Sequence, residues 1–233
     1  MSTKKHVLSA LALALVFVPV AVAQKPKKPA PPTPVTPPTT ALTLNAKPTT
    51  IVYANLTTLS GRLSGRGTVR NVVLRLWRDT TAPYGDSYTA TSTTVKTTSN
   101  GRYSLTAKPL LNTQYRVLTN VAPAVASPPK RVLVRIRTGV RLSDSTPRRG
   151  SRVRFYGSAF PAHDGRRVTI QRRSRSGRFV TVARTTLRDA GTTKSTYSRR
   201  VRVFRDGTYR VKVTGDGDHV NGLSRLKNID VHG

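Results

Sequence analysis

Two histidine–aspartate neighbours are the residues of this sequence most suited to do chemistry. His163-Asp164 and Asp218-His219 each place an imidazole beside a carboxylate, the two groups that orient a serine nucleophile in a hydrolytic triad. Adjacent side chains usually diverge, and no Gly-x-Ser-x-Gly nucleophile motif accompanies either pair. We therefore expect both pairs to lie in turns, and we predict that the protein has no catalytic residues and is not an enzyme.

Other chemistry is limited by the acidic and sulfur residues. The sequence has no Cys, and its nine acidic residues are all Asp, which excludes thiolate sites and disulfides and gives no evident carboxylate pair for glycoside hydrolysis. Asp216 and Asp218 alternate with glycines and could offer oxygens to calcium, but the third acidic position and closing Glu of an EF-hand loop are missing. Asp-Gly sequences commonly form tight turns. We predict no metal ligand and no cofactor, and leave open a calcium ion near Asp216 and Asp218.

The basic residues are more regularly placed. Lys and Arg number 41 against 9 acidic residues, a net charge of +32. In segments 152–155 and 200–203 arginines alternate with apolar residues, so in strands the arginines would face outward. If these strands are neighbours, their guanidiniums repel on one face, and a polyanion would offset that cost. The predicted polyanion-binding residues are Arg152, Arg154, Arg200, Arg202, Arg210 and Lys212. An ordinary solvated face of an Arg-rich protein is the alternative.

Trp77, the single tryptophan, is the one candidate for stacking on a sugar. It falls out of step with the apolar set Val72, Leu74 and Leu76, so we expect it to face outward. Packing against the insertion at residues 80–87 or against a domain junction is the favoured alternative.

Short alternating runs separated by Gly, Asn, Asp, Ser and Pro predict antiparallel strands from residue 41 onward, with no helical period. The expected strands are 42–44, 57–63, 72–77, 88–97, 102–107, 114–119, 131–137, 140–142, 152–158, 167–172, 178–187, 195–204, 208–214 and 228–231.

An internal repeat organises these strands. Tyr103 and Tyr115 recur as Tyr197 and Tyr209, with the same spacing and a shift of 94 residues. Seven strands in that length fit one immunoglobulin-type sandwich. We predict an all-β fold of two tandem immunoglobulin-like β-sandwich domains, residues 41–137 and 138–233. Tyr115 and Tyr209 are expected to return their hydroxyls to nearby backbone as tyrosine corners.

The N-terminal segment predicts export. Lys4 and Lys5 precede an apolar run that ends at Ala21-Val22-Ala23, the pattern of a cleaved signal peptide at residues 1–23. A retained anchor is the alternative. Residues 24–40 are rich in Pro, Thr and Lys and predict an extended linker. No later segment is long and apolar enough to span a bilayer, so we expect a secreted protein, or one bound noncovalently to the cell wall.

Several phrases resemble those of the secreted immunoglobulin-like repeat proteins of actinobacteria. They include Leu59-Ser60-Gly61-Arg62-Leu63, Asn100-Gly101-Arg102-Tyr103-Ser104 and Gly207-Thr208-Tyr209-Arg210-Val211, and the resemblance extends over residues 41–233. It implies a β-sandwich and an exported location but no activity. We therefore expect a noncatalytic surface module that binds an anionic cell-wall or matrix glycopolymer. A passive spacer or a protein–protein assembly module of the cell surface is the alternative, and nucleic acid is disfavoured because stacking aromatics are not interleaved with the basic residues.

Overall fold

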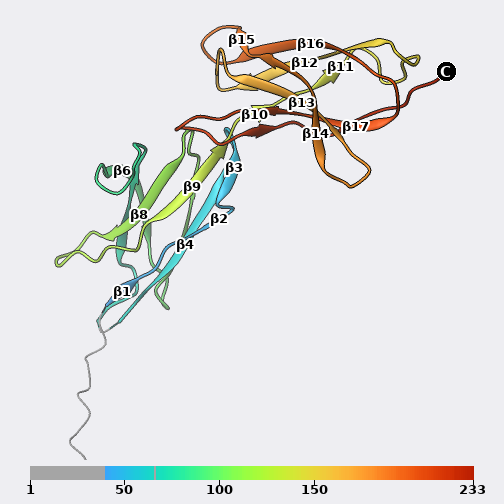
Figure 1. Ribbon diagram of the computed structural model, residues 1–233. Helices are drawn as coiled ribbons and strands as arrows, with labels where there is room; N and C mark the ends of the chain where they lie inside the picture. Colours follow the sequence, from blue (N-terminus) through green and yellow to red (C-terminus); the bar gives the residue numbers. More distant parts are fainter. Residues whose placement is uncertain (1–39, 66) are drawn as a thin grey trace, which may run out of the picture. The chain divides into compact units, whose positions relative to one another are not determined.

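The computed structural model describes residues 40–65 and 67–233, and these residues form strands without a helix (Figure 1). The predicted signal peptide, residues 1–23, and residues 24–39 of the predicted linker lie outside the described residues. No helix of the described part has the length and apolar character needed to cross a membrane. The all-β fold class is confirmed.

The first sandwich contains two sheets. In one, β4 lies between the edge strands β1 and β2 on one side and β7 on the other. The other has the order β3-β9-β8-β5-β6, and β3 runs parallel to β9. The strands are β1 (Ala41–Leu42), β2 (Asn45–Lys47), β3 (Thr50–Val52), β4 (Thr57–Ser64), β5 (Val73–Asp79), β6 (Thr89–Lys96), β7 (Arg102–Ala107), β8 (Thr113–Thr119) and β9 (Lys130–Arg135).

The second sandwich has a similar strand order. One sheet places β12 between β10 and β11 on one side and β16 and β15 on the other, and the second sheet has the order β14-β13-β17, with β18 and β19 along the far edge of β17. The strands are β10 (Arg137–Thr138), β11 (Arg141–Leu142), β12 (Arg152–Phe160), β13 (Arg167–Arg173), β14 (Phe179–Thr186), β15 (Arg188–Asp189), β16 (Ser195–Arg202), β17 (Gly207–Val213), β18 (Gly222–Leu223) and β19 (Lys227–Ile229).

The alternation of side chains produces a separate core in each sandwich. On β12 the apolar Val153 and Phe155 are buried while the arginines between them are exposed, as a strand with one face on a core requires. The first core includes Val134 and the second includes Ile136, so the chain passes from one core to the other within three residues. In the first sandwich β4 and β7 share a sheet while β5 and β8 belong to the other, and in the second sandwich β12 and β16 share a sheet while β13 and β17 belong to the other. This division of the strands is the immunoglobulin-like arrangement.

A tyrosine fastens the edge strand of each sandwich, but it is not the predicted one. Tyr103 on β7 lies opposite Gly61 on β4, and its hydroxyl donates a hydrogen bond to the carbonyl of Thr43, between β1 and β2. In the same way Tyr197 on β16 lies opposite Gly157 on β12. Its hydroxyl donates to the carbonyl of Gly139, between β10 and β11, at 2.6 Å.

The two glycines explain which tyrosine makes this bond. A Cβ on Gly61 or Gly157 would collide with the accepting carbonyl and crowd the tyrosine hydroxyl, so only glycine leaves room for the phenol to reach the edge strand. Tyr115 and Tyr209 have no such glycine opposite them on their sheets, where Arg78 and Lys130 or Arg172 and Lys227 lie across from them. The hydroxyl-to-backbone bond that we predicted for Tyr115 and Tyr209 is therefore made by Tyr103 and Tyr197.

Candidate functional site

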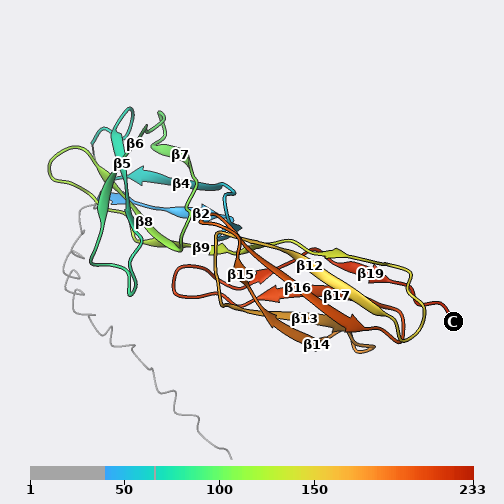
Figure 2. The ribbon, with the colours of Figure 1, turned by 90° about the horizontal axis from the view of Figure 1, so that it is seen from above.

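Four of the predicted basic residues lie together on one sheet. The strands β12 and β16 are antiparallel neighbours (Figure 2), with Arg152 opposite Arg202 and Arg154 opposite Arg200. All four are exposed. Residues directly opposite one another in an antiparallel pair have Cβ atoms only about 4.5 to 5.5 Å apart, and like charges there destabilise the sheet. Two successive arginine pairs thus stand on the outer face of the second sandwich.

A groove of about 710 Å³ continues this face along β12. Arginines from four strands of this sheet, β10, β11, β12 and β15, line it, and none of its described lining residues is acidic. Two of these arginines lie over aromatic rings, since the guanidinium carbon of Arg154 is 4.5 Å from the ring centre of Tyr156 and that of Arg137 is 4.4 Å from Phe160. The four arginines of the groove are Arg137, Arg141, Arg154 and Arg188. We call these four, together with Arg152, Arg200 and Arg202, the basic face.

The first sandwich has a smaller hollow at the equivalent place. It has a volume of about 570 Å³ and is lined by Gly61 and Tyr103, the counterparts of Gly157 and Tyr197 in the larger groove. Arg62 and Arg102 border it and lie opposite one another across β4 and β7. A cross-strand arginine pair beside a tyrosine-bridged glycine is therefore present in both sandwiches.

The structure separates Arg210 and Lys212 from the other predicted residues. Both lie on β17, in the second sheet of the sandwich, whereas the four arginine partners lie on β12 and β16 in the first. Arg210 is half-buried, with its guanidinium carbon 3.7 Å from the ring centre of Phe179 and its Nε donating to Gln171 Oε1 at 2.9 Å. The six residues therefore do not form one continuous surface.

Trp77 packs beside its own strand neighbours. It is half-buried on β5, opposite Arg116 on β8, and the guanidinium carbon of Arg116 is 5.7 Å from its ring centre. The same guanidinium lies 4.0 Å from the ring centre of Tyr88. Carbohydrate stacking by Trp77 stays a prediction.

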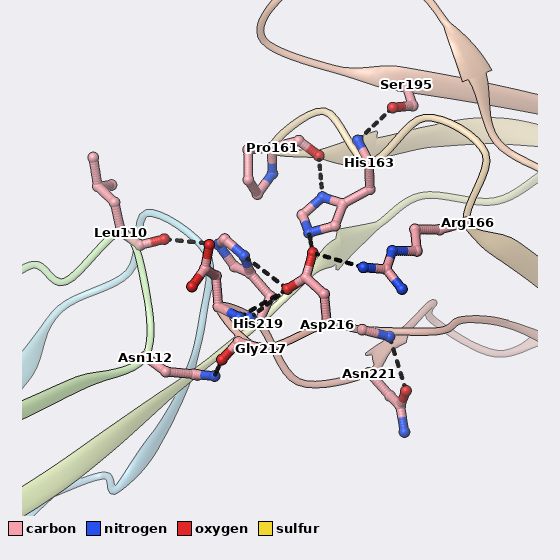
Figure 3. Close-up of polar contacts among 12 residues, drawn as sticks. Leu110, Asn112, Pro161, His163, Arg166, Ser195, Asp216, Gly217, His219 and Asn221 are labelled. Carbon is pink, nitrogen blue, oxygen red and sulfur yellow. Dashed lines mark hydrogen bonds and ion pairs between the residues drawn. The ribbon is translucent and has the colours of Figure 1, made fainter. Parts of the chain in front are cut away.

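A second cluster forms where the β12–β13 loop and the β17–β18 loop meet, and Figure 3 shows its polar contacts. His163 Nε2 is 3.3 Å from one carboxylate oxygen of Asp216, and His219 Nδ1 is 3.7 Å from the other. Both imidazoles are buried and pack edge to face, with ring centres 4.8 Å apart. The sequence neighbours Asp164 and Asp218 are not the carboxylates that face these rings.

The hydrogen bonds of the two imidazoles fix which nitrogen carries the proton in the neutral ring. His163 Nδ1 lies 2.9 Å from the carbonyl oxygen of Pro161, and His219 Nε2 lies 2.8 Å from that of Leu110. A carbonyl only accepts, so each of these nitrogens carries the hydrogen. The remaining nitrogens, which face Asp216, then present lone pairs toward a carboxylate.

The electrostatics of the cluster favour the neutral form of His219. Burial lowers the pKa of its imidazole, and the neighbouring His163 acts in the same direction. The bond to the Leu110 carbonyl and the nearby carboxylates oppose this shift but leave the pKa below its ordinary value. His219 Nδ1 is also buried without a hydrogen-bond partner among the described residues.

The cluster lacks the link to a hydroxyl nucleophile that a triad needs. The nearby Ser195 is fully buried, and its Oγ accepts the backbone N–H of His163 at 2.6 Å instead of contacting the ring. The loop around Asp216 also meets the first sandwich, because Asn112 Nδ2 donates to the carbonyl of Gly217 and the backbone N–H of Asn112 donates to that of Asp218. The arrangement suits ligand or metal binding better than acyl transfer.

Sequence reasoning did not find this cluster, although the topology contains a signal for it. In an immunoglobulin-like sandwich the loop after the second strand and the loop after the sixth lie at the same end. His163 is in the first of these loops and Asp216 and His219 are in the other. The sequence neighbours of the two histidines, Asp164 and Asp218, are not the carboxylate that this longer-range combination uses.

The comparisons with known proteins do not identify the chain. No protein-family model matches it, and no curated protein matches it. Among solved structures, it matches the tetra-tandem repeat in the extending region of a large adhesion protein at 16% sequence identity and a TM-score of 0.36, which covers 83% of this chain and 50% of that one. The chain thus spans half the length of that structure, and at this TM-score the match carries no conclusion about function.

Proposed function

We propose that this protein is a noncatalytic, exported or envelope-associated module that binds anionic glycopolymers of the cell wall or matrix through its basic face. The proposal includes the predicted signal peptide and the resemblance to secreted actinobacterial repeat proteins. It rests on the exposed arginines of β12 and β16 and on the groove beside them in the second sandwich. Arg210, Lys212 and Trp77 lie elsewhere, so we propose them only as secondary contacts.

The observation that carries the proposal is the uncompensated charge of the paired arginines. Arg152 with Arg202 and Arg154 with Arg200 occupy directly opposite positions, where like charges cost stability. The ion pairs of residues 40–65 and 67–233 all involve Asp216, so no carboxylate of the described chain forms an ion pair with this face. A bound polyanion would remove the repulsion and gain charge-assisted hydrogen bonds at the same time.

The groove suits a polymer that has both anionic groups and sugar rings. Guanidinium groups bind carboxylate, sulfate or phosphate oxygens through their planar fork of donors. The rings of Tyr156 and Phe160 add apolar faces beside Arg154 and Arg137, where sugar C–H surfaces can pack. A groove with both kinds of group is better matched to a charged glycan than to a simple inorganic anion.

The test compares two quadruple variants that each remove four positive charges. The first replaces Arg152, Arg154, Arg200 and Arg202 by Thr, which keeps the strand preference of these positions. The second replaces Arg70, Arg175, Arg184 and Arg225, which are exposed and lie outside the basic face. Binding to purified anionic wall glycopolymer and to duplex DNA is measured over a range of salt concentrations.

We expect the first variant to lose affinity for the glycopolymer and the second to keep it. Each lost contact should lower the slope of log affinity against log salt by up to about one unit. The first variant should be about as stable as the parent, because the relief of the repulsion between the arginine pairs offsets the lost contact of Arg154 with the Tyr156 ring. Equal losses in both variants would show general charge attraction, and a parent that binds no glycopolymer at moderate salt would favour a spacer or protein assembly module. Stronger binding to DNA would redirect the proposal to nucleic acid.

A further inference from the structure

We propose that His163, Asp216 and His219 form a binding site for a divalent transition-metal ion, with Zn²⁺ the best match, which joins the β12–β13 loop to the β17–β18 loop. The ligand atoms are His163 Nε2, His219 Nδ1 and the carboxylate oxygens of Asp216. This site is independent of the basic face and of the proposed glycopolymer binding.

The hydrogen bonds of the two rings leave the nitrogens that face Asp216 free to donate lone pairs to a metal ion. Since Pro161 and Leu110 carbonyls hold the hydrogens of the outer nitrogens, two lone pairs and a carboxylate point at one another in the neutral state. Where both rings are neutral, that arrangement is repulsive, and a cation held between the three groups removes the repulsion. A ligating histidine in proteins almost always donates its other N–H to a carbonyl or carboxylate, and both histidines here do so.

A buried unpaired nitrogen is the second, independent observation. His219 Nδ1 has no hydrogen-bond partner in the described structure although the residue is only 3% exposed. A buried polar atom without a partner costs about 1 to 3 kcal/mol, so such atoms call for an explanation. Coordination to a metal would satisfy this nitrogen directly.

The distances between the ligand atoms are close to those of a tetrahedral site. Zn–N and Zn–O bonds of about 2.0 to 2.2 Å at tetrahedral angles place ligand atoms roughly 3.4 Å apart. His163 Nε2 and His219 Nδ1 lie 3.3 and 3.7 Å from the nearest Asp216 oxygens. All three ligand atoms lie within 4.8 Å of one another, so a small loop adjustment would close the set. Three protein ligands leave a fourth position for water.

The types of ligand select the class of metal. Two imidazoles favour Zn²⁺ and its transition-metal neighbours, whereas Ca²⁺ needs six or more oxygens. Asp216 Oδ1 already accepts the backbone N–H groups of Asp218 and His219 at 3.0 and 2.8 Å, which orients the carboxylate. At the calcium site that the sequence left open around Asp216 and Asp218, one Asp216 oxygen is thus already engaged by backbone N–H groups. The histidine site offers two imidazole nitrogens, which suit Zn²⁺ better than Ca²⁺.

Arg166 is the nearest cationic group, and it competes with a bound metal. Its Nη2 lies 3.7 Å from Asp216 Oδ2, but 46% of its side chain is exposed, so it can turn toward solvent. Its positive charge would repel a metal ion at the site. Replacing Arg166 by Gln should therefore raise the affinity for Zn²⁺ several-fold, an effect that a purely structural histidine cluster would not produce.

The experiment titrates the purified, chelator-treated protein with ZnCl₂ by calorimetry and with CoCl₂ by visible absorption, with CaCl₂ as the comparison ion. We expect one equivalent of Zn²⁺ to bind and a Co²⁺ spectrum of tetrahedral nitrogen and oxygen coordination. Asp216→Asn and His219→Gln should each weaken Zn²⁺ binding by more than about 100-fold, since the loss of a second-shell partner alone costs 10- to 100-fold. The Asn amide oxygen can still accept the two backbone N–H groups, so this variant keeps the loop structure.

His232→Gln and Asp218→Asn are matched controls, because His232 is exposed and neither residue supplies a ligand atom. Both should bind Zn²⁺ as the parent does. Zn²⁺ should also raise the melting temperature of the parent and of these controls but not of Asp216→Asn. Protein zinc sites are expected to bind Zn²⁺ well below about 100 µM. Absence of saturable one-to-one binding below that concentration would therefore overturn the proposal. Retained binding in Asp216→Asn, loss in His232→Gln, or preference for Ca²⁺ would also overturn it.

Discussion

Removing one hydroxyl from Tyr197 tests the bond that holds the edge strand of the second sandwich. In Tyr197→Phe the ring stays in place, but the donor to the Gly139 carbonyl is lost. Tyr103→Phe makes the equivalent change in the first sandwich. We expect each variant to destabilise its own sandwich.

The size of the effect follows from the burial of the two partners. Tyr197 is only 3% exposed, so most of its ring and hydroxyl is shielded from solvent. Gly139, however, is exposed, and water can reach its carbonyl once the phenol hydroxyl is gone. The loss should therefore be near the lower end of the range for a buried hydrogen bond, about 1 kcal/mol, which lowers the melting temperature of a domain of this size by roughly 4 to 8 °C.

The single tryptophan makes the assay specific for one sandwich. Trp77 lies on β5 of the first sandwich, so its fluorescence reports the unfolding of that unit, whereas far-ultraviolet circular dichroism reports both. In urea, Tyr103→Phe should shift the fluorescence midpoint by about 0.5 M, for a slope near 2 kcal/mol/M. Tyr197→Phe should shift only the circular dichroism transition of the second sandwich.

Tyr156→Phe is the control, since Tyr156 lies on the same strand as Gly157 with its side chain on the outer face. It should change the free energy of unfolding by less than about 0.5 kcal/mol. If Tyr197→Phe is as stable as the parent, the hydroxyl bond does not hold the edge strand. If Tyr197→Phe shifts the Trp77 transition as much as Tyr103→Phe does, the two sandwiches unfold as one cooperative unit and our reasoning from separate cores is wrong.

Two further substitutions test other parts of the fold. Gly157→Ala should destabilise the second sandwich by about 1 to 3 kcal/mol in urea unfolding, because the new Cβ would collide with the Gly139 carbonyl, while Gly217→Ala, with nothing near its Cβ position, should have little effect. Asp79 is fully buried, and although burial raises its pKa, hydrogen bonds from the N–H groups of Gly85, Thr81 and Ser87 and the charge of Arg131 leave the pKa below its ordinary value. The stability from Asp79 is therefore present above the unfolded pKa of about 3.9 and is lost as the pH falls through the lower folded pKa. Asp79→Asn should flatten this acid-side loss in unfolding measurements from pH 7 to pH 2, and an unchanged pH profile would contradict the assignment.

The strand pattern and the pairing of β12 with β16 could be predicted from the sequence because they depend on local alternation and on the usual sandwich order. Burial of Val153 and Phe155 between exposed arginines is visible in the period of two. The same order would also have separated Arg210 from this face, since the sixth strand belongs to the other sheet. The prediction that Arg210 shares a surface with Arg152 was wrong because it rested on charge alone and not on the order of strands in the two sheets.

The tyrosine bond and the histidine cluster could not be read from spacing alone. The two tyrosines of one repeat are spaced as the two of the other are, so spacing does not tell which tyrosine makes the bond. Only the cross-strand register shows that Gly61 lies opposite Tyr103 and Gly157 opposite Tyr197. The cluster joins His163 to residues more than fifty positions later, so its geometry depends on two loop conformations. Those conformations are set by hydrogen bonds within the loops, such as that from the His219 N–H to the Asp216 carboxylate. The alternation of apolar and polar residues does not predict such bonds.

The few acidic residues explain why the arginines of the basic face have no carboxylate partners among the described residues. Most aspartate carboxylates whose hydrogen bonds are described accept backbone N–H groups in turns and loops rather than guanidinium hydrogens, and short Asp side chains suit that role because they reach the N–H two residues onward. Four of them accept from the residue two positions onward, namely Asp79 from Thr81, Asp144 from Thr146, Asp189 from Gly191 and Asp216 from Asp218, while Asp206 accepts from the distant Val231. Because these aspartates shape loops, the positive charge on the sheets has no ion-pair partner among the described residues. Among residues 40–65 and 67–233, Asp216 is the carboxylate that forms ion pairs, and it lies at the loop end of the sandwich. The proposed metal ion there and the proposed polymer on the sheet would therefore not compete for any residue.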